Sequence, residues 1–112
     1  MGEGSVRHVR VGEVQALRDS GAVLIDVREH QETAMGKAPG VSCMPLQSFV
    51  IDRLPADTPL VFICRSGNRS DAVATALAGM GYATFNVLGG MIAWQAAGLP
   101  VIAEDGGPGT VM

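Results

Sequence analysis

The sequence is poor in the residues that build metal sites, disulfide frameworks and membrane spans. Its 112 residues include two cysteines, Cys43 and Cys64, and two histidines. These residues show neither zinc-ligand spacing nor a redox Cys-x-x-Cys pair. No apolar run approaches the roughly 18 residues of a membrane span, and the first residues lack the pattern of a signal peptide. We therefore predict no metal site, no membrane partner, and two free thiols in a reducing cytoplasm.

Excess positive charge is also missing. Eight Lys and Arg residues face eleven Asp and Glu residues, so the net charge is -3 and the pI is about 5.2. The field of such a molecule does not attract nucleic acid or an anionic membrane surface. We expect no nucleic-acid partner, and any anion site must be a local arrangement of charges and amides.

The length and composition favour one globular domain. Hydrophobic residues make up 47% of the chain and charged residues 17%, which is a composition that can bury a core. The two ends are rich in glycine and carry little apolar pattern. We expect residues 1–5 and 104–112 to form flexible tails around a folded domain at residues 6–103.

Short apolar runs alternate with helix-like segments along this domain. Strands are predicted at 22–25, 41–44, 60–63 and 83–88, and helices at 11–20, 45–54, 70–80 and 90–98. Residues 60–63 are uniformly apolar, as expected for a central parallel strand with helices on both faces. The alternation predicts an α/β fold with a mostly parallel sheet flanked by helices.

The chemically informative segment starts where the predicted central strand ends. Cys64 lies at the carboxyl end of that strand, where open α/β sheets bind ligands. Gly67 and Asn68 tolerate left-handed conformations, so the loop can turn its amides inward, and a helix N-terminus follows near Ser70. With Arg65 and Arg69, these groups should stabilise a thiolate and lower the pKa of Cys64. The alternative from the residues alone is an inert, buried thiol.

Four segments of the chain together resemble the rhodanese-like sulfurtransferases. The segments are Leu24 to Glu29, Pro39-Gly40 with Pro45-Leu46, the loop Cys64-Arg65-Ser66-Gly67-Asn68-Arg69-Ser70, and Gly89-Gly90 with Trp94, Gly98 and Pro100. They occur in the family's order and span roughly residues 11–101. The resemblance implies a rhodanese-like three-layer fold, with a mostly parallel sheet of about five strands between helices.

The resemblance also implies a reaction. Cys64 would take a sulfane sulfur from a small anionic donor such as thiosulfate or a persulfide, with the loop binding the anion, and would pass it to cyanide or a thiol. Such a transfer requires no cofactor. A protein that accepts sulfur is a further candidate partner, and the sequence does not identify the physiological donor or acceptor.

Several residues outside the loop carry further expectations. The resemblance assigns Asp26 and Arg28 to a family-typical pair, which we interpret as supporting the loop. Lys37 stands where many family members carry histidine. We expect Cys43 to be at least half-buried, and Met91, Ile92 and Trp94 to belong to the core. Whether Cys43 can reach Cys64 stays open.

Other functions were compared with sulfur transfer. Cysteine phosphatases of related folds use a Cys-x5-Arg loop, whereas four residues separate Cys64 from Arg69, which makes a smaller ring. An arsenate reductase would use a similar site. A binding module without enzymatic activity is the third alternative, and the presence of Cys64 argues against it.

Overall fold

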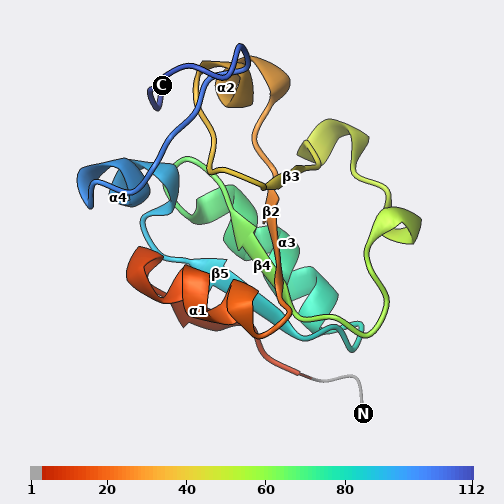
Figure 1. The fold of residues 1–112 in the computed structure, drawn as a ribbon. Helices are drawn as coiled ribbons and strands as arrows, with labels where there is room; N and C mark the ends of the chain where they lie inside the picture. The colour runs from red at the N-terminus through yellow and green to blue at the C-terminus, as the bar shows by residue number, and fades with distance from the viewer. Residues whose placement is uncertain (1–3) are drawn as a thin grey trace.

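A computed structural model describes residues 4–112, and residues 1–3 of the expected N-terminal tail lie outside the described part (Figure 1). The strands are β1 (Arg7–Val9), β2 (Val23–Asp26), β3 (Ser42–Cys43), β4 (Leu60–Ile63) and β5 (Thr84–Val87). They form one sheet in the order β1-β5-β4-β2-β3, and all four strand pairs are parallel. The expected α/β class is confirmed, and β4 is the central strand.

Residues 4–112 contain four α-helices and three 3-10 helices, and all of them except α4, which follows β5, lie between strands. The α-helices are α1 (Val14–Asp19), α2 (His30–Met35), α3 (Asn68–Ala78) and α4 (Gly90–Ala96). The 3-10 helices are η1 (Val11–Glu13), η2 (Leu46–Ser48) and η3 (Ile51–Arg53). Among the described residues, none of the helices has the length and apolar character to cross a membrane.

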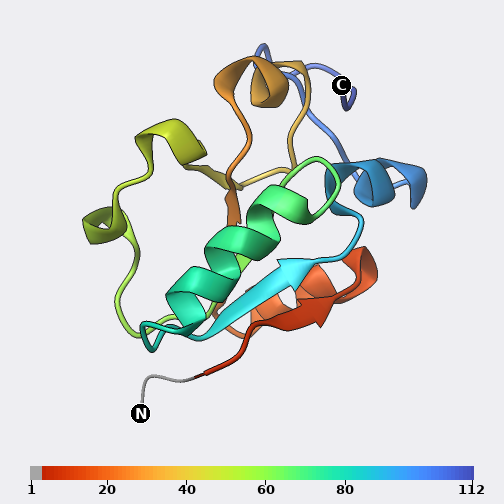
Figure 2. The ribbon, with the colours of Figure 1, turned by 180° about the vertical axis from the view of Figure 1, so that it is seen from behind.

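Helices on both faces of the sheet make the structure three-layered, with α1 and α4 on one face and α3 on the other (Figures 1 and 2). Val14 and Trp94 pack with Val61 and Ile63 on the first face. Ala74 and Leu77 of α3 pack with Leu60 and Phe62 on the second. Every residue of β4 is fully buried, because apolar side chains point to both faces and helices cover both.

The strand register aligns three strand ends at one edge of the sheet. Ile63 of β4 pairs with Asp26 of β2, and Asp26 pairs with Cys43 of β3. These three neighbouring parallel strands therefore end at the same edge of the sheet. The segments that follow them meet at this carboxyl edge. Cys64 is the first residue beyond β4.

The structure differs from the sequence-based expectations at several elements. The edge strand β1 and the helix α2 were not predicted. The predicted helix at 45–54 is wrong, because Phe49 and Val50 are extended and divide the segment into η2 and η3. β-branched Val50 disfavours an unbroken helix there.

The C-terminal segment, expected to be a flexible tail, is hydrogen bonded to the domain. The amides of Glu104 and Thr110 donate to the carbonyls of Ala34 and Met35 of α2, each at 2.9 Å. A further bond joins the amide of Gly109 to the carbonyl of Val101 at 2.9 Å. Glycine content predicted fraying, but these backbone bonds attach residues 104–110 to the end of α2.

Candidate active site

The loop after β4 is shaped by glycines at close backbone approaches. Gly67 has a φ of 106°, a left-handed value that suits glycine, and it caps the start of α3. The amides of Met91 and Ile92 donate to the carbonyls of Cys64 at 2.8 Å and Arg65 at 3.0 Å. A Cβ atom at Gly90 would overlap both of these carbonyls. The first turn of α4 therefore fixes the position of the backbone at Cys64 and Arg65.

The Sγ atom of Cys64 lies among hydrogen-bond donors of the loop. It accepts from the amide of Gly67 at 3.1 Å, the amide of Ser70 at 3.4 Å and the hydroxyl of Ser70 at 3.2 Å. Burial by itself raises the pKa of the Cys64 thiol, but donors from Ser70, Gly67 and Ser66 outweigh it and hold that pKa below its ordinary value. The geometry can stabilise a thiolate.

Asn86 of β5 completes a buried network beside the cysteine. The Ser70 hydroxyl lies 2.6 Å from the Oδ1 atom of Asn86 and 3.2 Å from Cys64 Sγ. Because a hydroxyl has one hydrogen, it can donate to only one of these two acceptors at a time. The Nδ2 atom of Asn86 donates to the carbonyl of Gly67 at 3.3 Å. Sequence reasoning missed Asn86, although a polar residue inside an apolar strand was a visible signal.

The two loop arginines have different partners. Arg69 forms a two-point ion pair with Glu32 of α2, with distances of 2.7 and 2.9 Å from Nη1 and Nη2 to the carboxylate oxygens. The hydrogen bond from Arg69 lowers the pKa of Glu32 to about 2. Arg65 is exposed and donates through Nε to the backbone oxygen of Met112 at 2.5 Å. Sequence reasoning missed Glu32 because its helix was not predicted.

The remaining loop residues are less involved with the sulfur. Ser66 is exposed and contributes through its backbone amide. Asn68 is also exposed and begins α3. Of the two loop residues that tolerate a left-handed conformation, Gly67 adopts it and Asn68 does not.

Asp26 and Arg28 form a fully buried ion pair at the end of β2. The Arg28 Nη2 atom lies 2.8 Å from Asp26 Oδ2 and also donates to the carbonyl of Gly36 at 2.8 Å. The Asp26 carboxylate also accepts the backbone amide of Arg28 at 3.0 Å. These bonds tie the end of α2 to the sheet. Among residues 4–112, no hydrogen bond connects Asp26 or Arg28 to the Sγ atom of Cys64.

Cys43 lies apart from Cys64 and does not pair with it. Both cysteines are free, and Cys43 is exposed, so the expectation of a half-buried residue is wrong. β2 separates β3 from β4, and two strand spacings of about 4.8 Å exceed the roughly 7 Å that a disulfide tolerates between Cα atoms. Cys43 is exposed because β3 is a two-residue edge strand.

The other sequence-based assignments have mixed outcomes. Met91 and Trp94 are buried core residues as expected, and Trp94 also donates to the carbonyl of Pro100 at 2.8 Å. Ile92 is 42% exposed, so its assignment to the core is wrong. Lys37 exchanges two backbone hydrogen bonds of 2.9 Å with Ile102, which joins the chain after α2 to the C-terminal segment.

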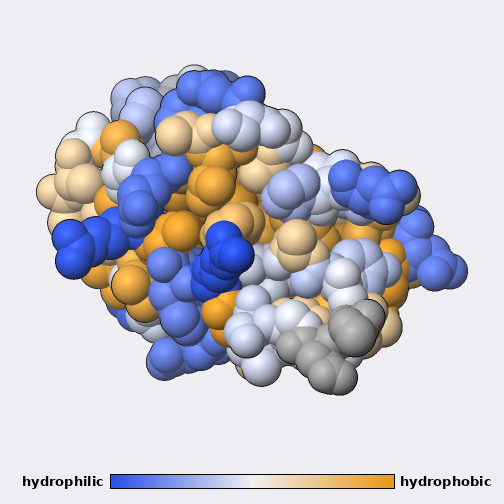
Figure 3. Space-filling view, turned by 90° about the horizontal axis from the view of Figure 1, so that it is seen from below, coloured by the Kyte–Doolittle hydropathy of each residue, from blue (hydrophilic) through white to orange (hydrophobic). Residues whose placement is uncertain are grey.

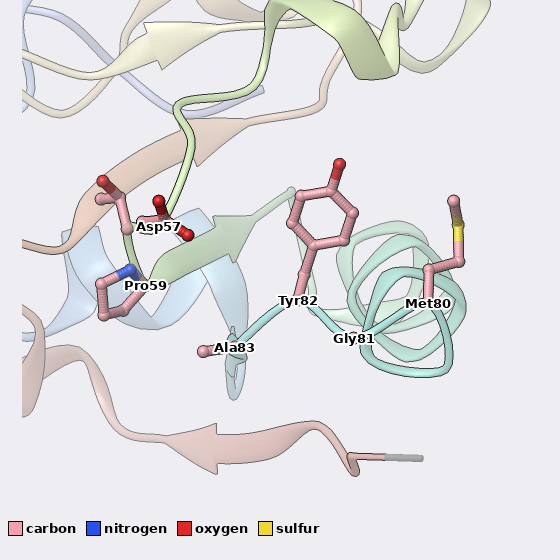
Figure 4. Close-up of a pocket in the computed structure, with 7 residues that line it drawn as sticks. Asp57, Pro59, Met80, Gly81, Tyr82 and Ala83 are labelled. Atoms are coloured by element: carbon pink, nitrogen blue, oxygen red, sulfur yellow. The ribbon is translucent and has the colours of Figure 1, made fainter. Parts of the chain in front are cut away.

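A cavity of about 450 Å³ lies at the opposite edge of the sheet from Cys64. Its lining includes Asp57 and Pro59 before β4, and Met80 and Tyr82 before β5 (Figure 4). The surface seen from below, on the side of the N-terminus, exposes apolar side chains between hydrophilic ones (Figure 3). No cysteine is among the residues that line this cavity. Residues 4–112 also contain no cluster of His, Cys, Asp and Glu able to hold a metal.

Comparisons with known proteins identify the family and the fold. The model of the rhodanese-like domain family matches residues 10–97. A sulfurtransferase of Allochromatium vinosum is 38% identical, covering 82% of this chain and 90% of its own. A thiosulfate sulfurtransferase of Pseudomonas savastanoi pv. phaseolicola is 37% identical, covering 75% and 82%. The crystal structure of a rhodanese-related protein from Thermoplasma volcanium superposes with a TM-score of 0.79 at 26% identity, covering 86% and 97%.

Proposed function

Because the chain belongs to the rhodanese-like domain family, we propose that it is a sulfurtransferase in which Cys64 carries sulfur as a persulfide. The observation that carries this proposal is the set of donors around Cys64 Sγ, from the Gly67 amide and the Ser70 amide and hydroxyl. A thiolate at neutral pH is the form that attacks sulfur. The relatives named as sulfurtransferases support the same reaction.

The first half-reaction forms the persulfide. The Cys64 thiolate attacks the outer sulfur of an anionic donor such as thiosulfate, and a new S–S bond forms as the S–S bond of the donor breaks. Sulfite leaves with the electron pair of that bond, so no external oxidant or reductant is needed. The amides that stabilise the thiolate then stabilise the negative charge on the outer persulfide sulfur.

The second half-reaction returns the enzyme to its starting state. A cyanide ion or a thiolate attacks the outer sulfur of the persulfide, and Cys64 leaves as a thiolate that the same donors stabilise.

Residues 65–70 form the anion-binding loop, with Arg65 as its exposed cation, and the Asp26–Arg28 pair keeps the neighbouring strand end in place. We propose the cytoplasm as the compartment, where the thiols stay reduced.

The test is a mass measurement of the intact protein after incubation with thiosulfate. We expect one added sulfur atom, removed by cyanide with release of thiocyanate, and no addition to Cys64→Ser. The matched control is Cys43→Ser, which should take up sulfur like the unmodified protein. Sulfur uptake by Cys64→Ser would refute the role of Cys64, and phosphate-ester hydrolysis without sulfur uptake would favour a phosphatase.

A further inference from the structure

The last arginine of the active-site loop is already bound to a carboxylate. Arg69 and Glu32 face each other through two parallel hydrogen bonds of 2.7 and 2.9 Å. The Glu32 side chain is 13% exposed and that of Arg69 35%, so solvent screens this pair only in part. Most of the positive charge that the loop presents at Arg69 is therefore offset within the protein.

Arg28 after β2, and Arg65 and Arg69 after β4, differ in what balances their charge. Arg28 is paired with Asp26, and Arg69 is paired with Glu32. Arg65 donates instead to a backbone oxygen, that of Met112. Because the hydrogen bond from Arg69 holds the pKa of Glu32 at about 2, this carboxylate stays ionised at any pH near neutrality.

We propose that Glu32 sets the charge selectivity of the Cys64 site by neutralising Arg69, which disfavours doubly charged sulfur donors relative to singly charged ones. The proposal rests on the proposed sulfurtransferase function and adds a substrate class to it. Electrostatic energy scales with the charge of the donor, so thiosulfate, a dianion, loses twice as much attraction as a monoanion does. The favoured donors are singly charged species such as persulfides of small thiols.

Two donors with the same leaving-group chemistry make this difference measurable. Thiosulfate releases sulfite when the Cys64 thiolate takes its outer sulfur. Benzenethiosulfonate is a monoanion, and the same attack on its outer sulfur releases benzenesulfinate with the electron pair of the broken S–S bond. The ratio of kcat/KM for thiosulfate to kcat/KM for benzenethiosulfonate then reports the local charge, because effects on Cys64 itself cancel.

The experiment compares four forms of the full chain: unmodified, Glu32→Gln, Arg69→Gln and the double variant. For Glu32→Gln we expect kcat/KM to rise roughly tenfold with thiosulfate and roughly threefold with benzenethiosulfonate, since the second effect is about the square root of the first. Arg69→Gln should lower the ratio. The double variant has the same local net charge as the unmodified protein, so its ratio should return to the unmodified value.

Glu104→Gln is the matched control for the loss of a negative charge. Glu104 is 65% exposed and faces His30 rather than Arg69, so this variant should leave the ratio unchanged. An unchanged or lower ratio in Glu32→Gln would overturn the proposal. If Glu32→Gln does not fold, the double variant provides the test, and a ratio that differs from that of the unmodified protein would overturn the proposal. Failure of the proposed function would look different, because the unmodified protein would then take sulfur from neither donor.

Discussion

The two cysteines occupy similar places in the sheet and have opposite properties. Cys64 follows the central strand and Cys43 ends an edge strand, both at the carboxyl edge. Cys64 is buried among donors and its pKa is lowered. Cys43 is exposed, yet partial desolvation of its sulfur raises its pKa, with Lys37 opposing that rise.

The difference arises from what the chain does after each cysteine. Beyond Cys64, the chain turns at Gly67 into α3, and the amides at the start of the helix face the sulfur. Beyond Cys43, the amide of Met44 donates to the carbonyl of Asp26, the last residue of β2, at 2.8 Å, and the amide of Leu46 donates to the carbonyl of Val27 at 3.2 Å. The position at a strand end therefore does not by itself lower the pKa of a thiol, whereas hydrogen-bond donors at the start of a helix lower the pKa of Cys64.

The largest expected effect comes from disturbing the backbone under Cys64. Gly90 and Gly40 both have positive φ values, of 56° and 71°, so alanine is strained at either position. At Gly90 the added methyl group would also overlap the carbonyls of Cys64 and Arg65, whereas at Gly40 it meets the flexible end of Arg18. We expect Gly90→Ala to lose most of its sulfur uptake and roughly 1–3 kcal/mol more stability than Gly40→Ala.

Denaturant unfolding and sulfur uptake from thiosulfate measure the two effects. Equal losses in the two variants would show that the strain of a positive φ, rather than support of the Cys64 backbone, dominates at Gly90.

A smaller effect is expected from removing one donor to the sulfur. Ser70→Ala deletes the hydroxyl 3.2 Å from Cys64 Sγ, so the pKa of Cys64 should rise and the fraction of Cys64 present as thiolate at a given pH should fall. Thiolate absorbance near 240 nm as a function of pH measures this rise. Ser66→Ala is the control, because Ser66 acts through its backbone amide. A shift of equal size in Ser66→Ala would contradict the assignment.

The pH dependence of the two thiols sharpens the comparison further. In the Cys43→Ser variant, thiolate absorbance should reach half its final value below the ordinary thiol pKa, because the lowered pKa of Cys64 favours the ionised form. In the Cys64→Ser variant, the midpoint should lie above the ordinary value, because the pKa of Cys43 is raised. Coincident midpoints would mean that the donors around Cys64 do not distinguish the two thiols.

The smallest expected effect is that of Cys43→Ser. An exposed residue without a role in the site should change stability by no more than about 0.5 kcal/mol and leave the rate of sulfur transfer within about twofold. Unfolding by denaturant and steady-state assay with thiosulfate are the measurements. A severalfold loss of transfer would show that Cys43 takes part, for instance by receiving sulfur from a partner.

The fold class and the loop could be predicted from local patterns. The uniformly apolar run at 60–63 indicated the central strand, and the glycine and polar residues after Cys64 indicated a turn into a helix. Elements whose formation depends on tertiary partners were missed. β1 has three residues and pairs only with β5, and α2 is a six-residue helix whose end is tied to Arg28 through the carbonyl of Gly36.

The sequence by itself determined the place of Cys64 at the end of a buried strand and the loop that supplies its backbone donors, because these features lie within a few residues of each other. Only the tertiary structure decided which distant side chains complete the site. Glu32 neutralises Arg69 from 37 residues away, and Asn86 shares the Ser70 hydroxyl from β5. Such partners meet because parallel strands bring their carboxyl ends to one edge, and no short-range pattern records that meeting.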